Sequence, residues 1–193
     1  VAKVARLETP AVSLLNVILN ADHMRNVQEL FEHHTEYREL IEGWGFNKEL
    51  PYGKGLTLLF SGPSGTGKTL LAHALAAHAG REILFLSAAD LPEKEGVETT
   101  LRDVFTEAAM REAVVLIDEC ETLFSKGDKR KATAFGALEK FEGITILTTN
   151  HPEQLDDALE RRIIYHFPFE EPDPAHRRQI WEVHLPPEVP LTS

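Results

Sequence analysis

The sequence predicts an α/β fold, a three-layer sandwich in which helices cover both faces of a five-stranded, mostly parallel sheet. Two observations favour this fold. Short apolar segments typical of buried strands alternate along the 193 residues with segments of helical periodicity, and such alternation indicates a parallel sheet. A glycine-rich loop also joins the first of these strands directly to a helix. Ligands of such sheets bind at the carboxyl ends of the strands, so this loop is where a ligand is expected.

The first expected element is an amphipathic helix over 22–42. Its apolar residues recur at helical spacing, with Asp22 as a possible cap and Gly43 as a stop. A linker that contains glycine and proline is expected from Gly43 to Gly55, where it leads into the first strand of the predicted sheet.

The remaining elements follow from apolar runs and from the residues that end them. Helices are expected from the glycine-rich loop to Gly80, around 101–108 and around 135–141. A further helix is expected to open at Asp173-Pro174. The five expected strands are Leu56–Phe60, Ile83–Ser87, Ala113–Ile117, Ile144–Thr148 and Tyr165–Phe169.

The glycine-rich loop carries the strongest motif. It fits the phosphate-loop (P-loop) pattern G-x-x-x-x-G-K-[ST] and stands between a strand and a helix, as phosphate binding requires. Its glycines let backbone N–H groups turn toward phosphates, and the helix adds its positive end. Lys68 is expected to neutralise the β and γ phosphates of ATP, and the Thr69 hydroxyl to coordinate Mg²⁺. The residues expected to bind ATP are Gly62, Pro63, Ser64, Gly65, Thr66, Gly67, Lys68, Thr69, Leu70 and Asp118.

Two later strands end in polar residues that suit ATP hydrolysis. Asp118 is expected to join Thr69 in the Mg²⁺ shell, through water because Mg²⁺ keeps much of its hydration. Glu119 is the expected base that activates the attacking water, although an Asp-Glu pair could instead cap a helix. Asn150 follows the next apolar strand, where its amide could hold that water and the γ-phosphate. On local sequence alone, Asn150 is more typical of a turn.

Composition limits the classes of protein that fit. A formal net charge of −11 argues against general binding to nucleic acid, and the basic run Lys129-Arg130-Lys131 is expected to be a solvated loop. The single cysteine, Cys120, cannot form an internal disulfide. No apolar run approaches the ~20 residues needed to span a bilayer. We therefore expect a cytoplasmic protein without a membrane or nucleic-acid partner.

The order of these motifs resembles that of the AAA+ ATPases. The resemblance implies that Asn150 is the residue called sensor 1 in that family. It also implies that Arg161 is a first arginine finger and Arg162 a second, which reach the ATP of a neighbouring subunit in a hexameric ring. The alternative is that both arginines are only exposed cations near a helix end. The motifs that carry the resemblance are the phosphate loop, Asp118-Glu119, Thr149-Asn150 and Leu155 to Arg162.

The resemblance covers about Leu56 to Trp181 and departs from the family in two places. Members that thread polypeptides have an aromatic residue, an aliphatic residue and glycine after the second strand, where this sequence has Lys94-Glu95-Gly96. The family's helical lid is expected to be largely absent. The expected domain organisation is an N-terminal helical segment and linker at 1–55, an ATPase core at 56–172 and the start of a truncated lid at 173–193.

The leading hypothesis is an ATP hydrolase that uses ATP and Mg²⁺ and works as a homo-oligomeric ring on a protein partner, which it remodels or switches. A scaffold in which ATP only orders assembly is the alternative, and the atypical loop at Lys94 to Gly96 favours it. A P-loop kinase of a small molecule is a third hypothesis, which leaves Asn150 and Arg161 unexplained.

Overall fold

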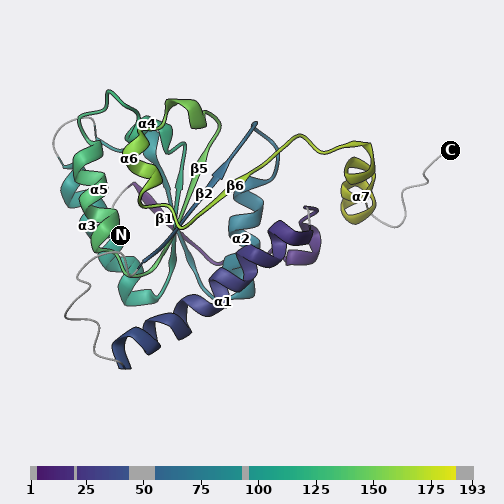
Figure 1. Ribbon diagram of the computed structural model, residues 1–193, viewed down its shortest axis with the longest axis horizontal. Helices are drawn as coiled ribbons and strands as arrows, with labels where there is room; N and C mark the ends of the chain where they lie inside the picture. Colours follow the sequence, from purple (N-terminus) through teal and green to yellow (C-terminus); the bar gives the residue numbers. More distant parts are fainter. Residues whose placement is uncertain (1–3, 20, 44–54, 93–95, 186–193) are drawn as a thin grey trace.

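A six-stranded sheet lies between two layers of helices in the computed structural model, which describes residues 4–19, 21–43, 55–92 and 96–185 (Figure 1). The strand order is β1-β3-β4-β5-β2-β6, and only β1 runs antiparallel to its neighbour. The strands are β1 (Ala5–Glu8), β2 (Leu56–Ser61), β3 (Ile83–Ser87), β4 (Val114–Asp118), β5 (Ile144–Thr149) and β6 (Tyr165–Pro168).

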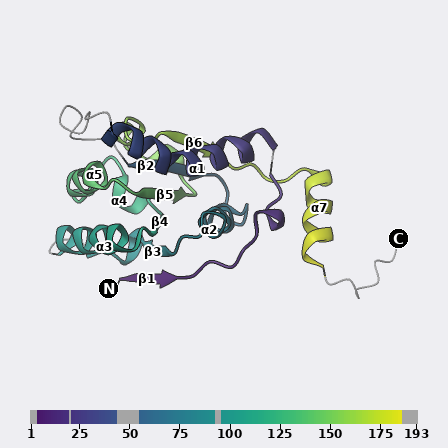
Figure 2. The ribbon, with the colours of Figure 1, turned by 90° about the horizontal axis from the view of Figure 1, so that it is seen from below.

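Helices α1 and α2 cover one face of the sheet, and α3 and α5 cover the other (Figure 1). Helix α7 lies beyond the end of the sheet, apart from both layers (Figure 2). No helix in the described part of the chain has the apolar length needed to cross a membrane. The helices are α1 (Ala21–Gly43), α2 (Lys68–His78), α3 (Val97–Arg111), α4 (Glu121–Phe124), α5 (Lys131–Lys140), α6 (Asp157–Glu160) and α7 (Pro174–His184), with short 3-10 turns η1 (Leu14–Asn16), η3 (Ala88–Asp90) and η4 (Pro152–Gln154).

The central strands are buried on both faces of the sheet. Since successive side chains of a strand point to opposite faces, each of these strands contributes to both cores. In β4, Val114 and Leu116 pack into the core formed with α1 and α2. Val115 and Ile117 pack into the core formed with α3 and α5. Each fully buried aliphatic side chain of this kind stabilises the fold by about 1.5–3 kcal/mol. The continuous apolar run of β4 therefore fixes both layers at once and determines where the acidic residues that follow it emerge.

The α/β class, the five predicted parallel strands and the helices on both faces are confirmed. The predicted helix over 22–42 is α1, which begins one residue earlier, so Asp22 lies in its first turn. Helix α7 begins as predicted, and the Asp173 carboxylate accepts a hydrogen bond from the His176 backbone N–H at 2.8 Å. The predicted linker lies outside the described residues except at its two ends, and so do Lys94 and Glu95.

The sixth strand, β1, was not predicted. It has four residues, of which only Ala5 is buried, so it lacks the apolar run that marks the other strands. Pairing with β3 holds it in place, and the Glu8 carboxylate lies 2.8 Å from Nε2 of His73 on α2. The sheet thus includes residues before position 56. The domain boundaries at 55/56 and 172/173 stay predictions.

Gly55 immediately precedes β2 and lies in a space that has no room for a side chain. An added Cβ would overlap the carbonyl oxygen of Phe141 and lie 3.1 Å from that of Gly143. Gly55→Ala is therefore expected to lower the free energy of unfolding by about 1–3 kcal/mol. Gly136→Ala, inside α5 with nothing within 4 Å of the added Cβ, is the control and should raise it by up to about 1 kcal/mol. Urea denaturation measures both, and equal stabilities would contradict this account of Gly55.

Candidate active site

Three parallel strands, β4, β5 and β2, lie side by side and end at the same edge of the sheet. The phosphate loop follows β2, Asp118 ends β4 and Asn150 follows β5. The strands that precede Glu119 and Asn150, β4 and β5, are therefore neighbours in the sheet. The strand that carries Asn150 lies between the other two, so its end is beside both the phosphate loop and the acidic pair.

The phosphate loop has a backbone that only glycine adopts readily at three of its positions, Gly62, Gly65 and Gly67. Gly62 has φ 138°, and a Cβ there would overlap the Phe169 carbonyl, while Gly67 has φ 100° and immediately precedes α2. The loop closes through the Thr66 hydroxyl, which donates to the Pro63 carbonyl at 2.9 Å. Helix α2 starts at Lys68, so the unpaired N–H groups of its first turn face the loop and favour an anion.

Lys68 is the centre of the site. Its side chain is buried, and Nζ donates to the Gly62 carbonyl at 2.7 Å, the Pro63 carbonyl at 2.8 Å and Asn150 Oδ1 at 2.8 Å. An ammonium has three donors, so all are in use. Burial lowers the pKa of Lys68, and the charges of Asp118 and Glu121 act in the opposite direction. Phosphate oxygens that bind Lys68 would replace these acceptors and release the amide of Asn150.

Asp118 is held by two donors at the end of β4. The Thr148 hydroxyl and the Glu119 backbone N–H both donate to Asp118 Oδ1, the latter at 3.1 Å. Thr148 is fully buried in β5, so it fixes the orientation of the carboxylate from the neighbouring strand. Sequence reasoning missed Thr148. Thr148 is one of three threonines in β5, so the sequence had no signal that this hydroxyl, and not another, lies beside Asp118.

Glu119 has an uncommon backbone conformation and a solvent-exposed side chain. Its φ of 53° lies in the left-handed region, which non-glycine residues rarely adopt. The Thr122 backbone N–H and hydroxyl both donate to the Glu119 carbonyl at 3.0 Å. Within the described residues, the exposed Glu119 carboxylate takes part in no hydrogen bond or ion pair. The turn is thus held by the backbone, and the carboxylate stays available for a reaction.

The residues expected to hold Mg²⁺ fit a hard divalent cation. The Thr69 hydroxyl makes no hydrogen bond with the part of the chain that the structure describes, while its carbonyl accepts from Nδ1 of His73 at 2.8 Å. Asp118 supplies a carboxylate close enough for its charge to act on Lys68, the neighbour of Thr69. A hydroxyl and a carboxylate are oxygen ligands of the kind that Mg²⁺ prefers.

The structure places Arg161 and Arg162 away from their own phosphate loop. They precede β6, and Ile164 N–H donates to the carbonyl of Thr57 at the opposite end of β2. Thr57 precedes Gly62 by five residues, which is about 16 Å along a strand. The structure therefore brings Lys68, Asp118 and Asn150 together but leaves both arginines outside that group.

The two arginines differ in their contacts. Arg162 donates to the Ala158 carbonyl at 2.6 Å, pairs with Glu139 at 2.5 Å and lies 4.4 Å above the Phe135 ring. It holds α6 against α5. Arg161 is exposed, and its guanidinium makes no hydrogen bond or ion pair with any described residue. Of these two arginines, Arg161 is therefore the one whose guanidinium is unengaged among the described residues.

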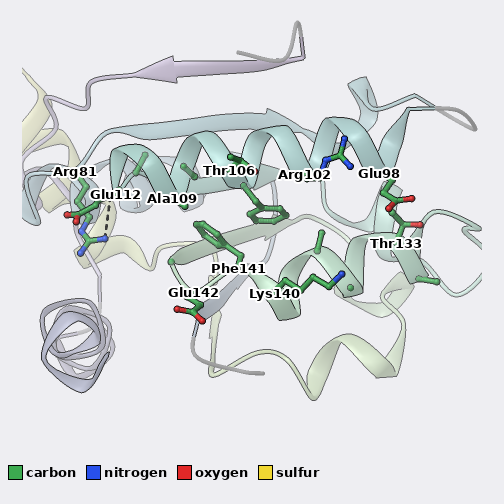
Figure 3. A pocket seen from close by; sticks show the side chains of 17 residues that line it. Arg81, Glu98, Arg102, Thr106, Ala109, Glu112, Thr133, Lys140, Phe141 and Glu142 are labelled. Atoms are coloured by element: carbon green, nitrogen blue, oxygen red, sulfur yellow. Dashed lines mark hydrogen bonds between the residues drawn. The ribbon is translucent and has the colours of Figure 1, made fainter. Parts of the chain in front are cut away.

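A pocket of about 1040 Å³ lies elsewhere, between α3 and α5 (Figure 3). Its lining includes the buried rings of Phe105 and Phe141 and charged side chains such as Arg102 and Lys140, which Figure 3 labels. None of the predicted site residues lines it. We find no link between this pocket and the phosphate loop.

Comparison with known proteins gives the family. The sequence profile of the "ATPase family associated with various cellular activities (AAA)" matches residues 58–171. The chain belongs to this family. The matched AAA region runs from β2 to beyond β6, so it includes the phosphate loop, Asp118, Asn150 and both arginines. Because the family is one of ATPases, ATP binding and hydrolysis are the activity of this AAA domain.

Several relatives are larger proteins. The AAA chain is 36% identical over 149 residues to the mitochondrial inner membrane m-AAA protease component YTA10 of Saccharomyces cerevisiae, covering 66% of this chain and 20% of that protein. It is 32% identical over 195 residues to the ATP-dependent zinc metalloprotease FtsH of Pelobacter propionicus, covering 91% and 30%. With FtsH of Pirellula staleyi it shares 38% over 152 residues, covering 68% and 21%. The chain thus spans 20% to 30% of the length of these relatives.

Proposed function

We propose that this AAA domain hydrolyses Mg²⁺-bound ATP within a homo-oligomeric ring, a hexamer by the family resemblance, that remodels or switches a protein partner. The observation that carries the proposal is the 2.8 Å hydrogen bond from Lys68 Nζ to Asn150 Oδ1. This bond joins the phosphate loop to the end of β5, which lies beside Asp118 at the end of β4. One bound γ-phosphate would therefore be within reach of Lys68, Asn150 and Asp118.

Each residue has a distinct role in this proposal. Lys68 exchanges its carbonyl acceptors for β and γ phosphate oxygens, which leaves the Asn150 amide to hold the attacking water. Glu119 takes the proton of that water, for which its unpaired carboxylate is suited. Thr69 and Asp118 would hold Mg²⁺, which when bound neutralises phosphate charge.

The ring is proposed because Arg161 is exposed and lies outside its own site. In a ring it would reach the γ-phosphate of the neighbouring subunit and stabilise the charge that develops there. Arg162 would act as a second finger only after leaving Glu139, so we assign the larger effect to Arg161. The net charge of −11 supports a protein partner over nucleic acid, and we propose the cytoplasm as its compartment.

Glu119→Gln is the variant that tests this function. Steady-state phosphate release should fall by about 10²- to 10⁴-fold, the usual contribution of a general base. ATP affinity by calorimetry should stay unchanged, because the amide keeps the shape of the side chain. Glu98→Gln, an exposed carboxylate on α3, is the control and should hydrolyse ATP normally. Chelation of Mg²⁺ by EDTA should stop turnover of the wild type.

Two results would count against the proposal. Near-normal hydrolysis by Glu119→Gln would remove the base from the mechanism. Intact ATP binding without phosphate release by the wild type, at every protein concentration, would favour the scaffold in which ATP only orders assembly.

A further inference from the structure

Arg130 joins three segments beside the active site. Its guanidinium donates to the Asp128 carboxylate, with distances of 2.6 to 3.1 Å, to the Thr122 carbonyl at 2.6 Å and to the Leu91 carbonyl at 3.3 Å. The side chains of Arg130 and Asp128 are only 14% and 13% exposed. The prediction of a solvated loop at 129–131 is therefore wrong for Arg130, because its charge is satisfied inside the fold.

One of these contacts leads directly to Glu119. Thr122 accepts from Arg130 through its carbonyl, and it donates twice to the Glu119 carbonyl through its N–H and hydroxyl. Helix α4 has four residues, too few to be stable without tertiary contacts. Arg130 therefore supplies an anchor for the turn that keeps Glu119 in the left-handed conformation.

Another contact leads to the segment after β3. Leu91 is buried and closes the η3 turn, with its N–H donating to the Ala88 carbonyl at 3.4 Å. Helix α4 packs against η3, so Arg130 spans a contact between two short elements. A shift of Leu91 relative to α4 must stretch or break the hydrogen bonds of the same guanidinium.

We propose that Arg130 is a positioning residue for ATP hydrolysis, which sets the Glu119 turn through Thr122 and ties it to Leu91, the residue that closes η3. The inference rests on the proposed function, in which Glu119 is the base. An arginine suits this role because its planar fork reaches two carbonyls and a carboxylate at once, whereas lysine has a single compact ammonium.

The first test compares Arg130→Lys with Arg130→Ala. Both should lower kcat by up to about 10²-fold, the effect of misplacing a reacting group by about 1 Å, while the affinity for a non-hydrolysable ATP analogue stays within about twofold of the wild type. Arg111→Ala is the control, because Arg111 also has carboxylate partners, Glu107 and Glu82, but at the far end of α3. It should leave kcat unchanged.

A double-mutant cycle tests the route through Thr122. Thr122→Val removes the hydroxyl that donates to the Glu119 carbonyl and keeps the shape of the side chain. Thr122→Val leaves the backbone N–H bond to Glu119 in place, so if Arg130 acts through Thr122, the loss of kcat in the double variant Arg130→Lys/Thr122→Val should be smaller than the two single losses combined. Additive losses of kcat would instead mean independent effects and would overturn the inference.

The remaining outcomes separate this inference from the proposed function. Unchanged kcat in both Arg130 variants, with Glu119→Gln inactive, would overturn the role of Arg130 alone. Normal hydrolysis by Glu119→Gln would instead remove Glu119 as the base, the part of the proposed function on which this inference rests. Parallel loss of thermal stability, analogue affinity and kcat in Arg130→Lys, which keeps the charge beside Asp128, would make Arg130 a folding residue and would also overturn its positioning role.

Discussion

Arg161→Ala is expected to lower steady-state ATP hydrolysis by about 10³- to 10⁵-fold, the range found for arginine fingers in other phosphate-loop enzymes. Its affinity for ATP should stay close to that of the wild type, because Arg161 lies outside the phosphate loop of its own chain and its guanidinium makes no hydrogen bond or ion pair with a described residue. Phosphate release and calorimetry on the assembled protein measure the two quantities.

Mixing variants tests whether the finger acts on a neighbouring subunit. Arg161→Ala keeps an intact nucleotide site, and Lys68→Ala keeps an intact finger, so a mixture of the two should recover part of the activity that each lacks alone. Activity per chain should also rise with protein concentration. A mixture that stays inactive in an assembled ring would reject a finger supplied by the neighbour.

Arg162→Ala is the matched control for this experiment. Its guanidinium pairs with Glu139 and covers the Phe135 ring, so the variant should lose stability through the contact between α6 and α5. If Arg162→Ala instead lowered hydrolysis as much as Arg161→Ala without loss of stability, the assignment of the finger to Arg161 would be wrong.

Lys68→Ala is expected to weaken ATP binding by about 10²- to 10⁴-fold, since each hydrogen bond to a charged partner contributes about 1.5–3 kcal/mol and two phosphates lose theirs. Hydrolysis should fall below detection at ordinary ATP concentrations. Lys126→Ala is the control, because Lys126 is exposed and paired only with Asp157 across 3.0 Å. Calorimetry with ATP compares the two, and equal affinities would defeat the assignment of Lys68.

The parts of the site that could be predicted from sequence are those encoded locally. The phosphate loop is one continuous motif between a strand and a helix, and Asp118 follows an apolar run that can only be a buried strand. Asn150 was harder, because its local sequence is that of a turn. It became a candidate because parallel strands end at one edge, and its hydrogen bond to Lys68 is consistent with that reasoning.

The features that escaped prediction depend on partners distant in the sequence. Thr148 matters because its strand lies beside Asp118, and Arg162 because α6 packs on Glu139 and Phe135. Arg130 looked like one charge of a solvated run, yet its carbonyl partner at Leu91 is 39 residues away. Hydrophobic periodicity carries no information on which buried carbonyl will receive a guanidinium.

The edge strand β1 has a practical meaning for any attempt to make a minimal ATPase from this chain. The family match begins at residue 58, but β1 at Ala5–Glu8 covers the outer edge of β3. A fragment that begins at the family boundary would lack β1 and would expose the backbone donors and acceptors of β3, which carries Leu84 and Leu86. An exposed strand edge of this kind pairs readily with other chains. A fragment that retains only the matched region should therefore be more prone to self-association, so the segment that contains β1 should be kept with it.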